Sequence, residues 1–185
     1  MTEHFTLAEL LRSATAERYP RLREQQKNPP PEVLENLQYL AETTLEPVRA
    51  IFGAPIDTTS GYRCPSINKK VGGSKTSQHV LGQAADIGIN DRHIGVLRAK
   101  MFHMGHKFRD GANADFHLFA AICLNLARLD VDQVIHEYGD KAGRPAWVHV
   151  SASRDRNRRQ ILAVGKYTGR KYQNLTVDQA LAMGQ

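Results

Sequence analysis

Two residues of the types that bind divalent metals, His79 and Asp86, stand seven positions apart in the middle of the chain. Asp86 lies inside an apolar stretch, 84–89, where a lone buried carboxylate is costly unless it is paired or binds a cation. Gly82 lies between the two and allows a tight turn that can bring the imidazole and the carboxylate together. The two residues are therefore either half of a metal site or a salt-bridged pair in the core.

A third candidate ligand, His149, lies in a short run typical of a β-strand. Because side chains alternate along a strand, Trp147, His149 and Ser151 share one face. Val148 and Val150 share the other face, which would belong to the core. Two histidines and one carboxylate match the ligand set of catalytic zinc sites, which leave a fourth position for water. Zinc at such a site would lower the pKa of that water toward about 7 and polarise a scissile carbonyl.

The elements that must position these residues follow from the spacing of apolar residues and from capping residues. The sequence predicts helices over residues 5–14, 32–52, 66–71, 90–104 and 113–129. It predicts strands over residues 55–60, 84–89, 132–138, 147–151 and 160–164. A polar turn, 139–145, would join two of these strands into a hairpin. Helices first and antiparallel strands later indicate an α+β domain.

The length of 185 residues fits one domain. We predict a single domain over residues 1–165 and a polar, loosely packed C-terminal tail over 166–185. No segment approaches the ~18 consecutive apolar residues that span a membrane, so no membrane insertion is expected. The N-terminus lacks the basic and apolar regions of a signal peptide. We therefore expect synthesis in the cytoplasm, with action on an outside substrate only after release by another protein.

The net charge is +6, and the sequence pI is about 9.5. A basic surface favours anionic polymers; the alternative is that the charge serves only to keep the protein soluble. A basic stretch lies near the C-terminus, but no recognisable motif for binding DNA or RNA accompanies it, so no nucleic-acid partner is expected. The arginines of that stretch are Arg154, Arg156, Arg158 and Arg159.

The two cysteines, Cys64 and Cys123, form no CxxC pair, which excludes a cysteine-based zinc site. Nothing in the sequence supports a disulfide between them. Two free thiols are the expectation for a protein made in a reducing cytosol.

Several motifs together resemble one known family, the zinc D-Ala-D-Ala carboxypeptidases and L-alanyl-D-glutamate endopeptidases, to which many bacteriophage endolysins belong. The resemblance extends from the Phe5-Thr6-Leu7 opening to about Ser151. It implies the fold shared with the Hedgehog signalling domain, in which helices pack on a small antiparallel sheet that carries the metal. The motifs are Ser60-Gly61-Tyr62-Arg63, Asn68, Gly72-Gly73, Ser77-x-His79-x-x-Gly82-x-Ala84-x-Asp86 and Trp147-Val148-His149-Val150-Ser151.

The resemblance implies a role for each residue that matches the family's motifs. His79, Asp86 and His149 would be the zinc ligands. Arg63 resembles the arginine that steadies the substrate carbonyl oxygen, and a fixed guanidinium aimed at developing negative charge is an electrostatic catalyst. The alternative for Arg63 is a salt bridge within a loop.

The sequence departs from its relatives at Ala146, where several of them carry an acid that acts as general base. We predict that Glu137 takes this role, because a hairpin would bring it near the metal. His136 is the second choice if the strand register slips by one residue. The alternative for Glu137 is to orient a zinc histidine. Alternation places Gln133, Ile135 and Glu137 on one face and Asp132, Val134, His136 and Tyr138 on the other.

The sequence thus predicts a monomeric zinc peptidase that hydrolyses stem peptides of bacterial peptidoglycan, as a carboxypeptidase or an endopeptidase. A phage or prophage lysin is one setting for it. The alternative is a non-catalytic cell-wall-binding or structural module that retains the fold, and Ala146 is its best support. The sequence leaves open whether D-Ala-D-Ala, L-Ala-D-Glu or cross-bridge bonds are cut.

Overall fold

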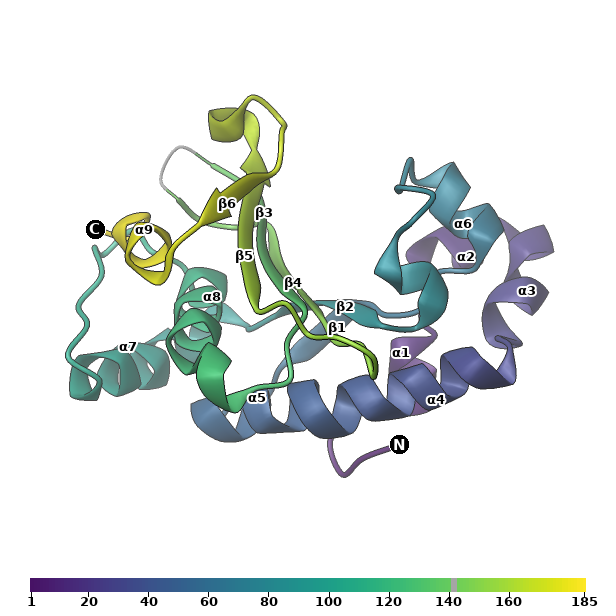
Figure 1. Ribbon diagram of the computed structural model, residues 1–185, viewed down its shortest axis with the longest axis horizontal. Coiled ribbons are helices and arrows are strands. Elements are labelled where there is room, and N and C mark those ends of the chain that lie inside the picture. The colour runs from purple at the N-terminus through teal and green to yellow at the C-terminus, as the bar shows by residue number, and fades with distance from the viewer. Residues whose placement is uncertain (141–142) are drawn as a thin grey trace.

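A six-stranded sheet lies at the centre of the computed structural model, which describes residues 1–140 and 143–185 (Figure 1). The strand order is β1-β2-β4-β3-β5-β6, and neighbouring strands are antiparallel except for β3 and β5. The α+β class is confirmed, with one parallel pair in a sheet that was predicted to be antiparallel. The strands are β1 (Asp57–Ser60), β2 (Ala84–Gly88), β3 (Gln133–Gly139), β4 (Trp147–Ser151), β5 (Gln160–Gly165) and β6 (Gln173–Leu175).

Helices surround the sheet, and Figure 1 shows the long α4–α5 segment running beneath it. The core fills the space between α8 and one face of the sheet, where Phe116, Phe119 and Val148 are fully buried. The α-helices are α1 (Leu7–Leu10), α2 (Ala14–Arg18), α3 (Arg23–Lys27), α4 (Pro31–Leu40), α5 (Glu46–Phe52), α6 (Pro65–Lys70), α7 (Ile94–His103), α8 (Ala114–Asn125) and α9 (Val177–Ala182). The short turns are η1 (Pro20–Leu22), η2 (Ala41–Leu45), η3 (Gln78–Leu81), η4 (Asp91–His93), η5 (Leu126–Arg128) and η6 (Lys166–Thr168).

The predicted helix 32–52 is a single helical segment interrupted by a π-helical turn, η2. Pro47 is the second residue after this turn, and its ring nitrogen cannot donate to the carbonyl of Thr43. A π turn widens the helix by one residue and accommodates that loss without a break.

The first predicted helix is shorter than expected. The Thr6 cap and its reciprocal bond with Glu9 are present, but α1 ends at Leu10 rather than near Ala14. The cause is Ser13, whose hydroxyl accepts from the Ala16 N–H and starts a second helix, α2.

The predicted hairpin is confirmed, because β3 and β4 pair with Glu137 opposite Trp147 and Ile135 opposite His149. Of the predicted turn 139–145, residues 141 and 142 lie outside the described residues. The chain then passes from β4 to the far side of β3, which makes β5 parallel to β3.

The segment after Gly165 is packed on the domain, and the prediction of a loose tail is wrong. β6 extends the sheet beside β5. A capping box between Thr176 and Gln179 starts α9, whose Ala180 and Leu181 are buried. The prediction failed because it rested on the polar composition of the segment. A short edge strand and a short helix need only a few apolar contacts to pack.

Both cysteines are free thiols, as expected, and the structure also buries both. Burial raises the pKa of the Cys123 thiol, which makes it a poor nucleophile. Among the described residues, no helix combines the length and apolar character that crossing a bilayer requires.

Asp115 gives the fold a pH dependence that one substitution should remove. Burial raises the pKa of its carboxyl to about 6, against the opposing hydrogen bond from the Ile89 N–H, and the charges of Asp91 and Asp57 add to the rise. The protonated form therefore stabilises the fold. This contribution is present below the unfolded pKa of 3.8 and is lost as pH rises through about 6.

Asp115→Asn cannot ionise and keeps an oxygen acceptor for Ile89. At about pH 8 we expect the variant to have a higher free energy of unfolding than wild type. The difference should be at most about 3 kcal/mol, and solvent screening of the partly exposed carboxyl reduces it. At about pH 4 the advantage should vanish. Urea unfolding at both pH values measures this, with Asp155→Asn on the exposed surface as the control. An advantage that is equal at both pH values would contradict the assignment.

Candidate metal centre

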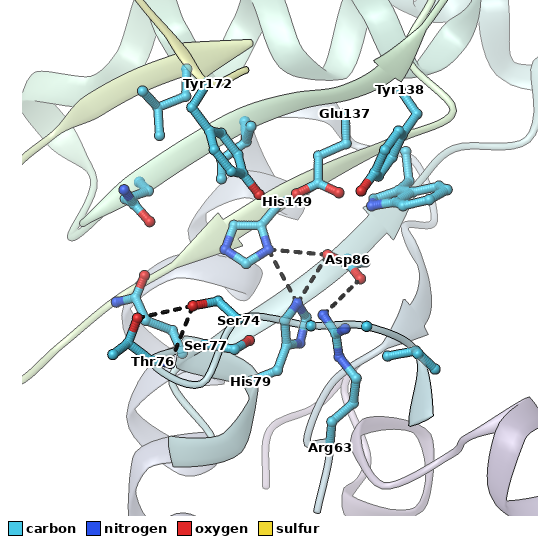
Figure 2. A pocket seen from close by; sticks show the side chains of 18 residues that line it. Arg63, Ser74, Thr76, Ser77, His79, Asp86, Glu137, Tyr138, His149 and Tyr172 are labelled. Carbon is cyan, nitrogen blue, oxygen red and sulfur yellow. Dashed lines mark hydrogen bonds and ion pairs between the residues drawn. The ribbon is translucent and has the colours of Figure 1, made fainter. Parts of the chain in front are cut away.

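Three potential ligand atoms converge on the face of the sheet away from α8 (Figure 2). Asp86 on β2 lies directly opposite His149 on β4. Asp86 Oδ1 is 3.1 Å from His79 Nε2 and 3.1 Å from His149 Nδ1. The two imidazole nitrogens are themselves 3.1 Å apart. All three side chains are buried, so residues distant in the sequence form one compact cluster.

The position of His79 is fixed by the η3 turn and its connections. Its Nδ1 donates to the Gly61 carbonyl at 2.7 Å, because a carbonyl oxygen can only accept. This bond sets the tautomer and leaves Nε2 as the free ligand atom facing Asp86. Gly82 ends the turn with a φ of +70°, and a Cβ there would lie 2.6 Å from the Val33 carbonyl oxygen. Glycine is therefore required for both the backbone conformation and the close approach to α4.

The cluster fits a zinc ion by its donor set and its spacing. Two imidazoles and one carboxylate are the ligands of many catalytic zinc sites, with Zn–N and Zn–O distances near 2.0–2.2 Å. Tetrahedral bonds of that length separate ligand atoms by about 3.3 Å, close to the 3.1 Å separations here. The bond from His79 to Gly61 is the outer hydrogen bond that commonly orients a zinc histidine.

The electrostatics of the cluster favour the protonation states that bind a cation. Burial alone would raise the pKa of Asp86, but the two imidazoles that face its carboxylate, His79 and then His149, hold it well below its usual range. Burial lowers the pKa of His79, against the opposing effect of Asp86. An ionised carboxylate beside a neutral imidazole is the form that coordinates a metal.

Arg63 lies beside the cluster, at the end of the segment that follows β1. Its guanidinium Nη2 is 3.6 Å from Asp86 Oδ2, the carboxylate oxygen that does not face the imidazoles. Its Nε is buried and has no hydrogen-bond partner among the described residues. Arg63 therefore both balances the charge of Asp86 and retains a donor for another ligand.

Glu137 lies on the same face of the sheet as His149, as the predicted register required. Burial raises the pKa of its carboxyl, His149 opposes the shift and Asp86 adds to it. The indole N–H of Trp147 lies near this carboxyl and favours its ionised form. The two groups are not in hydrogen-bonding geometry, and Trp147 Nε1 has no hydrogen-bond partner among the described residues. His136, the second choice, lies on the opposite face, fully buried, with its ring 5.3 Å from that of Phe119.

Tyr138 lies at the site, although alternation predicted the opposite face. The register between β3 and β5 shifts between Glu137 and Gly139, and Tyr138 has a φ of +48°. This bulge directs two successive side chains to the same face. The Tyr138 ring packs 5.2 Å from that of Trp147.

A buried carboxylate, Asp132, ties the loop of His79 to the sheet. Gln78 donates to Asp132 Oδ2 at 3.0 Å, and Arg158 Nε donates to Oδ1 at 2.8 Å.

Arg158 belongs to the basic stretch near the C-terminus, and in that stretch Arg154 also pairs with an acid, Glu35, at 3.1 Å. Two of the four arginines in this stretch thus have acidic partners within the domain.

An open pocket of about 520 Å³ covers this face of the sheet. It brings together all five residues singled out in the sequence: Arg63, His79, Asp86, Glu137 and His149. Tyr138 and Tyr172 also line it, and sequence reasoning missed both. The bulge at Tyr138 has no signal in the alternation pattern, and Tyr172 belongs to the segment that was predicted as a loose tail.

A cluster of two imidazoles and one carboxylate, flanked by an acid and an arginine in an open pocket, defines a metal-dependent hydrolase site. Residues 3–116, more than half of the chain, match the family Peptidase M15, and the chain belongs to this family of metal-dependent peptidases. The family predicted from the sequence is therefore confirmed. The matched region contains Arg63, His79 and Asp86 but ends before His149 and Glu137. No curated protein matches the chain.

Proposed function

We propose that the protein is a zinc peptidase that hydrolyses peptide bonds in the stem peptides of bacterial peptidoglycan. The observation that carries the proposal is the convergence of His79, Asp86 and His149 at mutual distances of 3.1 Å, in a pocket that Arg63 and Glu137 also line. Membership of the M15 family supports a peptidase of cell-wall peptides in general.

In this proposal His79 Nε2, Asp86 Oδ1 and His149 Nδ1 hold the zinc. When bound, zinc supplies a Lewis acid that polarises a carbonyl and lowers the pKa of a coordinated water. Glu137 accepts a proton from the attacking water and later delivers it to the leaving amine. The Arg63 guanidinium donates to the peptide carbonyl oxygen as negative charge develops on it. Tyr138 and Trp147 form one wall against which the peptide lies.

Digestion of purified peptidoglycan tests the proposal. The wild-type protein should release new amino termini that mass spectrometry assigns to D-Ala-D-Ala, L-Ala-D-Glu or cross-bridge bonds. Chelator should abolish the release, and added zinc should restore it. His149→Ala is the matched inactive variant. Intact muropeptides after prolonged digestion by the zinc-loaded wild type would contradict the proposal.

The same experiment separates the enzyme from a non-catalytic wall-binding module. A module would sediment with cell walls and leave both the turbidity and the peptides unchanged. The main support for a non-catalytic module was Ala146, which replaces the acid of several relatives. The pocket, however, contains an acid at a different position, Glu137. A phage or prophage lysin is the setting that we propose, and it predicts loss of turbidity in cell-wall suspensions.

Arg63→Ala is expected to fold normally and to be a poor catalyst. Loss of one donor to a developing oxyanion typically lowers kcat by about 10²–10³-fold. Arg63→Lys keeps the charge but loses the planar fork, so it should recover only part of the rate. Steady-state kinetics on a stem peptide, with zinc content measured alongside, provide the check. Unchanged kinetics in Arg63→Ala would leave the arginine as the partner of Asp86 alone.

A further inference from the structure

The C-terminal segment between β5 and β6 borders the metal-centre pocket. Ile135, Leu162 and Val164 form a small apolar cluster that is separate from the main core. The sheet register places this cluster on the same face as His149, since Ile135 pairs with both His149 and Leu162. After β5 the chain turns through η6 and returns as β6, and this return carries Tyr172 to the pocket.

The Tyr172 side chain is largely exposed, so packing in the core does not account for its position. The residue is 61% exposed, yet it lines the pocket, and Figure 2 shows its hydroxyl directed toward His149 and Glu137. It makes no hydrogen bond to another described residue. Partial burial of the ring raises the pKa of the Tyr172 phenol, and the nearby charges of Glu137 and Asp86 add to the rise, which agrees with a position close to the cluster.

Tyr138 stands on the other side of Glu137, with its hydroxyl also directed into the pocket (Figure 2). Its positive φ is a conformation that a tyrosine rarely adopts, and such strain is found most often at functional sites. Two phenols therefore border the space where a substrate must lie, one on each side of Glu137.

We propose that Tyr172 binds the substrate: its hydroxyl donates a hydrogen bond to a backbone oxygen of the peptide held at the metal centre. The inference rests on the proposed peptidase function, because it assumes a peptide in this pocket. Tyr172 is outside the matched region 3–116, so this contact belongs to a part of the chain that the family match leaves unassigned. Tyr172 thereby forms part of one wall of the substrate site.

The chain offers a direct measure of binding, because its single tryptophan, Trp147, lines the pocket. Zinc-loaded Glu137→Gln protein can be titrated with a synthetic stem pentapeptide while Trp147 fluorescence is recorded. Adding Tyr172→Phe removes the hydroxyl and keeps the ring, so affinity should fall about fivefold to tenfold, as for loss of one neutral hydrogen bond. Adding Tyr39→Phe, on α4 away from the pocket, should leave affinity unchanged.

In the otherwise wild-type enzyme, Tyr172→Phe should raise KM for the same peptide, with zinc content and melting temperature unchanged. Equal affinity and equal KM in Tyr172→Phe would overturn the inference, as would a loss seen only in Tyr172→Ala, which would assign the contact to the ring alone. If the wild type binds the peptide but never cleaves it, the proposed function fails. The titration then decides the role of Tyr172 independently.

Discussion

Asp86→Ala is expected to lose the metal and the activity together. Asp86 Oδ1 lies 3.1 Å from both imidazoles, so its removal leaves His79 and His149 facing each other without this anion between them. Loss of residues that merely orient a ligand typically costs 10–100-fold in metal affinity. Loss of the ligand itself should exceed about 10²-fold and reduce turnover to background.

Metal content after dialysis against a weak chelator, measured beside circular dichroism, checks this expectation. Asp86→Asn is the matched variant, because it keeps the side-chain shape and one oxygen but loses the charge that attracts a divalent cation. It should bind zinc more weakly than wild type and more tightly than Asp86→Ala. Stoichiometric zinc in Asp86→Ala would remove Asp86 from the ligand set.

The parts of the site that lie on regular strands could be predicted from the sequence. Alternation along β4 separated Trp147 and His149 from the core residues Val148 and Val150, and the structure agrees. The same rule placed Glu137 with His149, because the hairpin keeps its register up to that residue. The period of two along a strand is a local property, so a single sequence suffices to reveal it.

The parts that depend on irregular backbone could not be predicted. The bulge after Glu137 moves Tyr138 to the site face, and nothing in the run His136-Glu137-Tyr138 distinguishes it from a regular strand. Tyr172 reaches the pocket only because β6 pairs with β5, a contact between strands that a polar sequence does not indicate. Such positions are set by tertiary contacts rather than by local pattern.

The position of the loop that carries His79 depends both on local sequence pattern and on tertiary contacts. Its spacing from Asp86 and the intervening Gly82 suggested a meeting of the two side chains. No pattern in the sequence indicated that Gln78 and Arg158 would share the buried carboxylate Asp132 and hold this loop to the sheet. A metal ligand on a loop needs such an anchor, because an imidazole free to move would not hold the ion in a fixed geometry.

Glu137→Gln is expected to keep zinc and lose most turnover. The substitution preserves the size of the side chain and its position opposite Trp147 but removes the group that accepts a proton. General-base catalysis typically contributes about 10²–10⁴-fold, so kcat on a stem peptide should fall within that range. Glu3→Gln, at a glutamate whose side chain is 85% exposed, is the control and should match wild type.

If Glu137 instead only orients His149, the Glu137→Gln variant should lose zinc affinity in parallel with rate. Turnover close to wild type would assign the base to another group, and that group would not be His136, because it lies in the core on the opposite face of β3.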